Sequence, residues 1–346
     1  PVSPRRARGR ASSPAWCCPG PAWDGVPPVE WRKGVSLTGH DLWLDPQVVR
    51  ERAFISHAHT DHARRHHLGV LTEGTLALLP PQRRPRKVRV APLDEAVELG
   101  DATLTLHDAG HMLGSAQLLF QHDGWRLLYT GDLKLRRGAG RLTAIPAADV
   151  VVLESTYGRP HFRFPDPENV LETLALWCRR ALDARVTPVL LANALGKAQE
   201  VMLALARYDL RFALEERCVP FARGYEQAGV TLPEWVELGD EEPEGRVVVA
   251  PPAGKSAVRR LNRYRTALVS GWAMEPEFWR RFGADYAFPY SDHCDFDELL
   301  EVVQRSGARQ VYTVHGYTED LAEQLRGRGV RAHPLAATEQ LGLLLV

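Results

Sequence analysis

Short apolar runs, separated by glycine, proline and aspartate, dominate the chain between residues 42 and 157. Runs of three or four apolar residues bounded by turn-forming residues are typical of strands. Asp123-Gly124 lies between two of these runs, which is a strong signal for a β-hairpin. We therefore predict a β-rich N-terminal part with short connections and with strands at residues 42–44, 53–55, 104–106, 117–120, 127–129 and 150–153.

After Tyr157 the pattern changes, and strand-like runs alternate with segments whose apolar residues recur at helical spacing. The expected helices cover residues 169–182, 197–208, 295–305 and 318–326. The expected strands cover residues 189–191, 247–249, 267–269 and 310–314. Such alternation is typical of an α/β architecture. The chain is thus predicted to have a β-rich core that is interrupted by an α/β insertion and completed near the C-terminus.

Composition sets limits on the class of protein. The 346 residues predict about two domains. An apolar share of 45% and a charged share of 25% are ordinary for a globular protein and exclude a long disordered or fibrous chain. No run of 18 apolar residues occurs, so a membrane span is not expected. Lys+Arg and Asp+Glu are equal in number, 43 of each, so the net charge gives no sign of nucleic-acid binding. Such binding would depend on local basic patches, such as residues 83–89 and 259–265.

The cysteines and the first residues of the chain indicate the cellular compartment of the protein. Five scattered cysteines, an odd number, fit a reduced cytoplasmic chain better than a disulfide scaffold. Residues 1–22 hold five prolines and four arginines but no acidic residue, and they lack the apolar centre of a signal peptide. We expect residues 1–27 to be a disordered or non-native leader.

The strongest chemical signal is the six-residue motif His57-Ala58-His59-Thr60-Asp61-His62, which directly follows a predicted strand. His57 and His59 lie two positions apart, so an extended or loop backbone can direct both at one metal ion. Asp61 and His62 can then face a second ion. Imidazole and carboxylate ligands together suit Zn²⁺ and its neighbours. The motif therefore predicts a site for two metal ions.

Four further residues that can bind metal follow other strand-like runs, namely Asp45, His111, Asp132 and His315. A single histidine or aspartate at the end of a strand is usually a cap or turn residue. Several of them in a chain that also carries the six-residue motif favour convergence on one rim of the predicted sheets.

Together these residues resemble the metallo-β-lactamase superfamily, with its HxHxDH motif, a later histidine and a Gly-Asp pair. Residues 154–158 (ESTYG), 291–295 (SDHCD) and His315-Gly316 are similar to motifs A, B and C of its β-CASP nuclease branch, and residues 194–200 also resemble that branch. The similarity covers about residues 34–346 and is greatest to the bacterial DNA-ligase-associated exonucleases. It implies an αββα sandwich from residues 28–160 and 289–346, with an α/β β-CASP domain inserted at 161–288.

The resemblance also implies roles for individual residues. Two zinc ions, or manganese in their place, would be held by His57, His59 and His111 on one side, by Asp61, His62 and His315 on the other, and by Asp132 between them. Asp45 would orient a metal-bound histidine. The implied catalytic residues are Asp61, Asp132, Glu154 and His293, and the predicted phosphate-binding residues are Lys197, Ser155, Thr156 and Ser291.

The function that the resemblance implies is a zinc-dependent DNA nuclease. We expect a 5′-end exonuclease on single-stranded or overhanging DNA, active in end processing and repair and functionally linked to a DNA ligase. An RNA-processing β-CASP ribonuclease is the close alternative, because His315 at motif C is typical of RNA-acting members. A small-molecule hydrolase shares the metal ligands but leaves the insertion and His293 unexplained. A non-catalytic binding protein would usually have lost ligands, and here every ligand position is filled.

Overall fold

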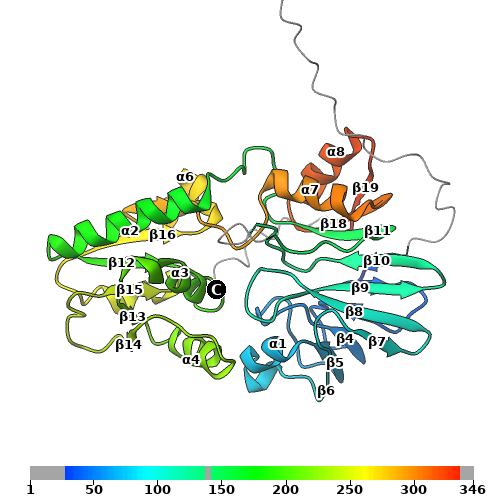
Figure 1. Ribbon diagram of the computed structural model, residues 1–346, viewed down its shortest axis with the longest axis horizontal. Helices are drawn as coiled ribbons and strands as arrows, with labels where there is room; N and C mark the ends of the chain where they lie inside the picture. The colour runs from blue at the N-terminus through cyan, green and yellow to red at the C-terminus, as the bar shows by residue number, and fades with distance from the viewer. Residues whose placement is uncertain (1–27, 137–141, 336–346) are drawn as a thin grey trace, which may run out of the picture.

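The computed structural model describes residues 28–136 and 142–335, so the predicted leader at 1–27 lies outside the described residues. The described chain folds into three sheets with helices against their faces, which confirms the mixed α/β class (Figure 1). Two of the sheets pack together on one side of the molecule. The third, with its own helices, lies beside them (Figure 1).

The first two sheets form one layered body, which we call the two-sheet unit. Its first sheet has six strands in sequence order: β1 (Val29–Trp31), β2 (Val35–Leu37), β3 (Trp43–Leu44), β4 (Arg52–Phe54), β5 (Leu68–Leu71) and β6 (Lys87–Val90). Its second sheet has seven strands, in the order β19 (Arg331–Pro334), β18 (Gln310–Gly316), β11 (Val150–Ser155), β10 (Trp125–Tyr129), β9 (Ala116–His122), β8 (Ala102–Asp108) and β7 (Ala96–Leu99). Strands from the C-terminal part of the chain therefore complete a sheet that the N-terminal part begins.

A continuous apolar core joins the two sheets face to face. Buried side chains of the first sheet, such as Leu44, Phe54 and Val70, share one cluster with Leu118 and Tyr129 of the second. On the outer face of the second sheet, α7 (Phe296–Ser306) and α8 (Thr318–Arg326) pack against a separate apolar cluster. The short helix α1 (Glu73–Leu78) follows β5.

The predicted hairpin is confirmed. Strands β9 and β10 pair antiparallel with His122 opposite Trp125, so the loop is the two residues Asp123 and Gly124. Both residues have positive φ angles, of 44° and 77°, as a type I′ turn requires.

The third sheet and its helices form what we call the parallel-sheet unit, residues 167–288. All its strands are parallel, in the order β14 (Trp235–Glu237), β13 (Phe212–Leu214), β15 (Val247–Ala250), β12 (Thr187–Leu191), β16 (Tyr264–Val269) and β17 (Tyr286–Phe288). Helices α2 (Pro167–Asp183), α3 (Lys197–Leu205) and α4 (Val219–Gln227) share a core with one face of the sheet. The short helices α5 (Lys255–Val258) and α6 (Pro276–Arg281) contribute to the cluster on the other face. Both faces are covered, which explains why these strands are runs of valine, leucine and alanine.

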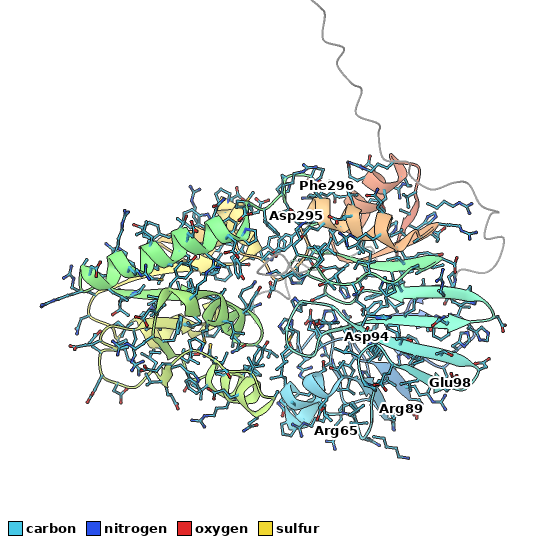
Figure 2. The ribbon with its side chains drawn as sticks, viewed as in Figure 1. Arg65, Arg89, Asp94, Glu98, Asp295 and Phe296 are labelled. Carbon is cyan, nitrogen blue, oxygen red and sulfur yellow. The ribbon has the colours of Figure 1, made fainter. Side chains whose placement is uncertain are left out.

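The chain returns to the two-sheet unit just before α7, at a well-defined helix start. The Asp295 carboxylate accepts a hydrogen bond from the Glu298 backbone N–H at 2.8 Å, and the Glu298 side chain accepts one from the Asp295 N–H at 3.0 Å. This reciprocal pair is a capping box. Asp295 and Phe296 lie at the junction of the two units (Figure 2). The cap thereby fixes the direction of the preceding residues 291–294, which enter the site described next.

The secondary structure expected from the sequence is confirmed in outline. Helix α8 has the bounds predicted for it, and α2 and α7 differ by at most two residues at either end. The predicted helix 197–208 is α-helical only to Leu205 and continues as a 3₁₀ turn over Ala206–Tyr208. Among the described residues, no helix is both long and apolar enough to cross a membrane.

Candidate metal centre

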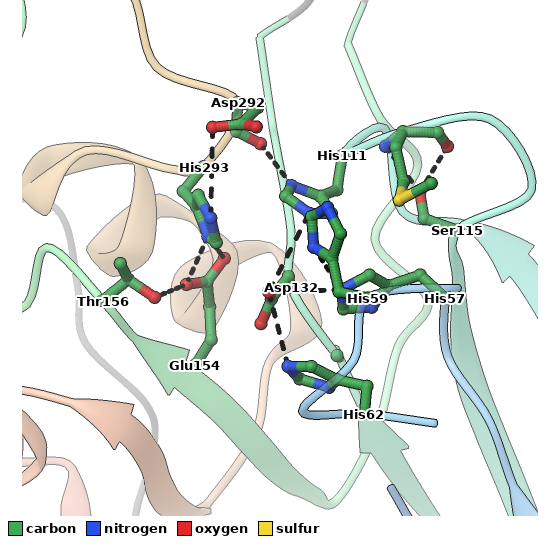
Figure 3. Close-up of polar contacts among 12 residues, drawn as sticks. His57, His59, His62, His111, Ser115, Asp132, Glu154, Thr156, Asp292 and His293 are labelled. Carbon is green, nitrogen blue, oxygen red and sulfur yellow. Dashed lines mark hydrogen bonds and ion pairs between the residues drawn. The ribbon is translucent and has the colours of Figure 1, made fainter. Parts of the chain in front are cut away.

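The histidines and aspartates of the predicted site meet where the two sheets end beside the parallel-sheet unit. The six-residue motif is the loop after β4, His111 lies between β8 and β9, Asp132 follows β10, and His315 is near the end of β18. Figure 3 shows the side chains of His57, His59, His62, His111 and Asp132 converging on one space. His57, His111 and Asp132 are 0%, 2% and 7% exposed, so the cluster is buried.

Hydrogen bonds fix the ring orientation of His57 and His62 through one carboxylate. The Ser56 hydroxyl donates to Asp45 Oδ2 at 2.5 Å, and it therefore accepts from Nδ1–H of His57 at 2.9 Å. His62 donates from Nδ1 to the same Asp45 oxygen at 2.8 Å. The remaining ring nitrogen of each histidine, Nε2, points into the cluster. Burial would lower the pKa of His62, but the carboxylates of Asp132, Asp61 and Asp45 raise it well above its usual value, so a metal ion would displace a proton from this ring. Asp45 thus lies where the sequence analysis expected it, behind a histidine of the motif.

Backbone carbonyl groups orient the other two imidazoles. His59 donates from Nε2 to the Leu195 carbonyl at 3.1 Å, and His111 donates from Nδ1 to the Asp292 carbonyl at 3.0 Å. The lone pairs of His59 Nδ1 and His111 Nε2 therefore face the cluster as well. Leu195 belongs to the parallel-sheet unit, so both units take part in orienting these rings.

The resulting donor set fits a metal ion. His59 Nδ1 lies 2.9 Å from His57 Nε2 and 3.3 Å from His111 Nε2. Lone pairs that face each other at such distances repel unless a positive charge lies between them. Burial lowers the pKa of His57 well below its usual value and that of His111 to about 3, with the neighbouring imidazoles adding to both shifts. The rings of His57 and His111 are therefore neutral, the form that binds a metal.

Asp132 lies between two groups of possible ligands. Its Oδ2 atom is 3.5 Å from His57 Nε2, 3.5 Å from His62 Nε2 and 3.9 Å from His111 Nε2. Burial would raise the pKa of this carboxyl group, but the surrounding histidines, His62 first, lower it to about 2. Asp132 is thus an anion shared by the two sides of the cluster.

The second side of the cluster is more open. Asp61 Oδ2 lies 3.5 Å from His62 Nε2, and its side chain is 28% exposed. The rings of His62 and His315 lie with their centroids 4.9 Å apart. Buried groups of histidine and aspartate of this kind are typical of a dinuclear metal site. The donors fit zinc, which accepts nitrogen and carboxylate ligands in this number.

Glu154 and His293 form a buried pair beside this cluster. His293 Nδ1 lies 3.1 and 3.0 Å from the two Glu154 oxygens, and the Thr156 hydroxyl and the Leu133 backbone N–H also donate to that carboxylate (Figure 3). The His293 ring lies 4.6 Å from the ring of His111, centroid to centroid. Burial would lower the pKa of His293, but the Glu154 carboxylate raises it to about 10.

The four residues predicted to bind phosphate have internal partners. Ser155 donates to the Val314 carbonyl at 3.0 Å, Thr156 donates to Glu154 Oε2 at 2.5 Å, and the Ser291 hydroxyl donates to the His293 carbonyl at 3.1 Å. Lys197 Nζ lies 2.7 Å from Glu200 Oε2 and 3.1 Å from Asp292 Oδ1, and the residue is 3% exposed. Their binding of phosphate stays a prediction.

Two glycines allow the site-forming loops to come this close. Gly131, with φ 54°, precedes Asp132, and a Cβ atom there would lie 2.7 Å from the Ser56 Cβ. Gly316, with φ 69°, follows His315, and a Cβ atom there would lie 2.5 Å from the Ser155 carbonyl oxygen. Any other residue would force these segments apart.

Several functional contacts were not expected from the sequence. Ser56 and Tyr129 both donate to Asp45, Tyr129 at 2.9 Å. The carbonyl groups of Leu195 and Asp292 have no side-chain signal that a sequence could show. The sequence indicates only a strand residue at Tyr129, although its place two residues before the Gly-Asp pair puts it next to the site.

We expect Tyr129→Phe to lower the affinity for metal about tenfold, as the loss of a supporting hydrogen bond behind a metal ligand usually does. The substitution removes one donor from Asp45, which holds His62, and it keeps the ring that packs edge-on against Phe54. Titration against a competing chelator measures the effect. Tyr312→Phe, whose ring lies beside His333, is the control. Equal affinities in both variants would contradict this role of Tyr129.

Comparison with known proteins identifies several proteins that are similar in sequence to this chain. No family model matches it. It is 38% identical over 327 residues to a protein named Probable DNA ligase from Opitutus terrae, which covers 93% of this chain and 32% of that protein. It is 30% identical over 297 residues to 5′ exonuclease Apollo from Gallus gallus (78% of this chain, 61% of that protein). It is 33% identical over 108 residues to an RNase J-like protein from Methanocaldococcus jannaschii (30% and 25%).

A solved structure is similar in fold. A protein of unknown function from Enterococcus faecalis superposes with a TM-score of 0.51 at 14% identity, over 81% of this chain and 78% of that one. The relatives and the buried histidine–aspartate cluster define a class of metal-binding α/β proteins. Within that class the chain is a relative of the β-CASP proteins of the metallo-β-lactamase superfamily. It spans about a third of the length of the ligase-named relative.

Proposed function

We propose that this chain is a metal-dependent nuclease that hydrolyses phosphodiester bonds in DNA, starting at 5′ ends. The observation that carries the proposal is the buried ligand cluster with the Glu154–His293 pair directly beside it. In this proposal residues 28–160 and 289–346 are the metallo-β-lactamase αββα sandwich, and residues 161–288 are the inserted β-CASP domain. In support, every strand of the third sheet lies between residues 187 and 288.

The proposed ligands are those that the resemblance implies, and the orientation of the His57, His59 and His111 rings supports three of them. His57, His59 and His111 would hold one zinc ion, and Asp61, His62 and His315 would hold the other, with Asp132 shared. Two such ions would supply a hydroxide at neutral pH and would offset charge on the attacking and leaving oxygens. Asp61 is placed to accept a hydrogen bond from the nucleophile, because its carboxylate is the most accessible of the cluster.

His293 is the proposed proton donor. Glu154 holds its Nδ1–H, so the remaining N–H, on Nε2, can face a phosphoryl or leaving oxygen. A protonated imidazole there would stabilise negative charge as it develops and then protonate the leaving group. Glu154 would keep that imidazole charged and oriented.

Two arginines beside the motif loop support binding of a phosphate backbone. Arg83 Nη1 donates to the Thr60 and Ala63 carbonyls at 2.9 and 2.8 Å, and Arg64 Nη1 donates to the same two groups. Burial, and next the charge of Arg83, lower the pKa of Arg64, so the two guanidinium groups interact. A phosphate bridging them would relieve that repulsion. Residues 83–89, to which Arg83 and Arg89 belong, continue this positive charge along the outer edge of the two-sheet unit, where Arg89 lies (Figure 2).

The relatives favour DNA and keep RNA as the second candidate. A relative named as a DNA ligase contains a region similar to nearly all of this chain, which supports a functional link with ligation. A relative named 5′ exonuclease covers 78% of the chain. The RNase J-like relative and His315 favour the ribonuclease alternative.

Matched DNA and RNA oligonucleotides of one sequence test the proposal. Each is prepared with a 5′-phosphate or a 5′-hydroxyl and labelled at the 3′ end, and zinc or manganese is supplied. We expect faster shortening of the 5′-phosphorylated DNA from its 5′ end. An Asp132→Asn preparation controls for contaminating nucleases. Preferential cleavage of RNA would support the alternative, and cleavage of neither polymer would contradict a nuclease.

A further inference from the structure

A second cluster of metal-competent side chains lies at the end of the sheets opposite the catalytic centre. His40 lies in the turn between β2 and β3, Asp101 lies between β7 and β8, and His122 ends β9. One ligand atom from each of the three lies within 4.8 Å of those of the others. Strand β9 runs from Ala116, next to the His111 loop, to His122, so its seven residues put about 20 Å between the two clusters.

The distances suit a tetrahedral ion. His40 Nδ1 lies 3.9 Å from Asp101 Oδ1, and His122 Nδ1 lies 3.8 Å from Asp101 Oδ2. Ligands about 2.0–2.2 Å from a zinc ion lie roughly 3.3–3.6 Å from each other, so only a small side-chain movement is needed. Asp101 can make that movement, because its side chain is 74% exposed.

The two imidazoles are held in a ligand-like orientation. His122 Nε2 lies 3.1 Å from Asp123 Oδ2 and can donate a hydrogen bond to it, while Nδ1 faces Asp101. A carboxylate behind a histidine in this way is a common support for a metal ligand. In the chain without an ion, Nδ1–H of His122 donates to the Asp101 carbonyl at 3.3 Å, so a bound zinc ion would displace that proton.

The rings of His40 and His122 lie 4.5 Å apart, centroid to centroid, and His40 also packs edge-on against Phe120. Their side chains are only 15% and 17% exposed. Burial, and next the charge of His122, lower the pKa of His40, which favours its neutral form. Two imidazoles in contact are thus packed with their nitrogen atoms directed at one carboxylate.

We infer that His40, Asp101 and His122 form a structural zinc site that joins the two sheets at the end remote from the catalytic centre. His40 lies in a turn of the first sheet, and Asp101 and His122 lie at turns of the second sheet. The ion would therefore join the two sheets directly at turns that are far apart along the chain. The site goes beyond the proposed nuclease function and does not depend on it.

Zinc titration of the metal-free full chain by calorimetry, with metal analysis after dialysis, tests this inference. We expect His122→Ala to bind one zinc equivalent fewer than the unchanged chain and to lose the part of the zinc-dependent rise in Tm that this equivalent gives. His107→Ala is the matched control, because His107 also faces a carboxylate, Asp94, at 2.6 Å but belongs to no group of three possible ligands among the described residues.

The result that would overturn the inference is an equal number of bound zinc ions in all three proteins. Should His122→Ala not fold, Asp101→Asn changes only an exposed side chain and is expected to weaken the same equivalent at least tenfold; unchanged binding there would also overturn it. Because the readout is a difference between variants, it is independent of whether the catalytic centre acts on DNA, on RNA or on neither.

Discussion

Asp132→Asn is expected to lower the rate of phosphodiester hydrolysis by at least about 10³-fold. Asp132 Oδ2 is the one oxygen that approaches His57, His62 and His111 together, within 3.9 Å. The amide keeps the shape but removes the negative charge that both proposed ions would share. A loss of about 4 kcal/mol in charge stabilisation corresponds to this fold-change.

Initial rates on a labelled oligonucleotide and metal content by elemental analysis measure the effect together. The variant should lose at least one of the two catalytic equivalents. Asp149→Asn is the matched control, since Asp149 accepts a hydrogen bond from the Arg126 N–H at the opposite end of the strands. Full activity of Asp132→Asn with both ions bound would be incompatible with a shared ligand at this position.

His293→Ala is expected to lower kcat by about 10²–10⁴-fold, the usual contribution of a general acid. In contrast to Asp132→Asn, the metal content should stay unchanged, because His293 is a proton donor and not a ligand in the proposed mechanism. A parallel loss of metal would instead make His293 part of the ligand set. An unchanged kcat would show that His293 is a buried structural histidine and not a proton donor.

The pH profile separates these roles further. His293 acts when protonated, so activity is present below its pKa and is lost as the pH rises through it. Glu154 raises that pKa to about 10 in the chain without metal, and nearby bound dications would lower it from there. Glu154→Gln removes the negative charge, so the alkaline limb should move to lower pH.

The control for this shift is Glu215→Gln, a buried glutamate of the parallel-sheet unit that hydrogen-bonds to the Arg217 N–H. It should leave the alkaline limb in place. An alkaline limb that Glu154→Gln also leaves unmoved would show that another group sets it.

The sequence predicted the class of fold, and it indicated which metal-competent residues could lie together. The reason is local, because Asp45 and the Gly131-Asp132 pair directly end or closely follow short apolar runs, and the Asp123-Gly124 turn has one favoured geometry. Helices α2, α7 and α8 show clear periodicity. Helix α1, with six residues, and strands such as β13 and β14, with three each, are too short to show a period.

What the sequence could not show is how distant segments meet. Lys197 at a helix start suggested a phosphate contact, but the fold brings Glu200 and Asp292 against its ammonium group. Asp292 reached the site through a backbone carbonyl, a role open to any residue type. Ser56 and Tyr129 acquire their roles only because Asp45, with φ 44°, turns its carboxylate toward both.

In the proposed nuclease, the contacts between the two units would limit how a polymer enters. His59 depends on the Leu195 carbonyl for its orientation, the Leu113 N–H donates to the Tyr225 hydroxyl at 3.2 Å, and Lys134 pairs with Glu200. In the proposed nuclease, parting the units to admit the middle of a strand sideways would break all three contacts and release His59 from its support. A strand that entered by a free end would not require the units to part. Selectivity for the ends of a nucleic-acid strand would then result from the contacts that hold the two units together. It would not require recognition of the chemical group at the end of the strand.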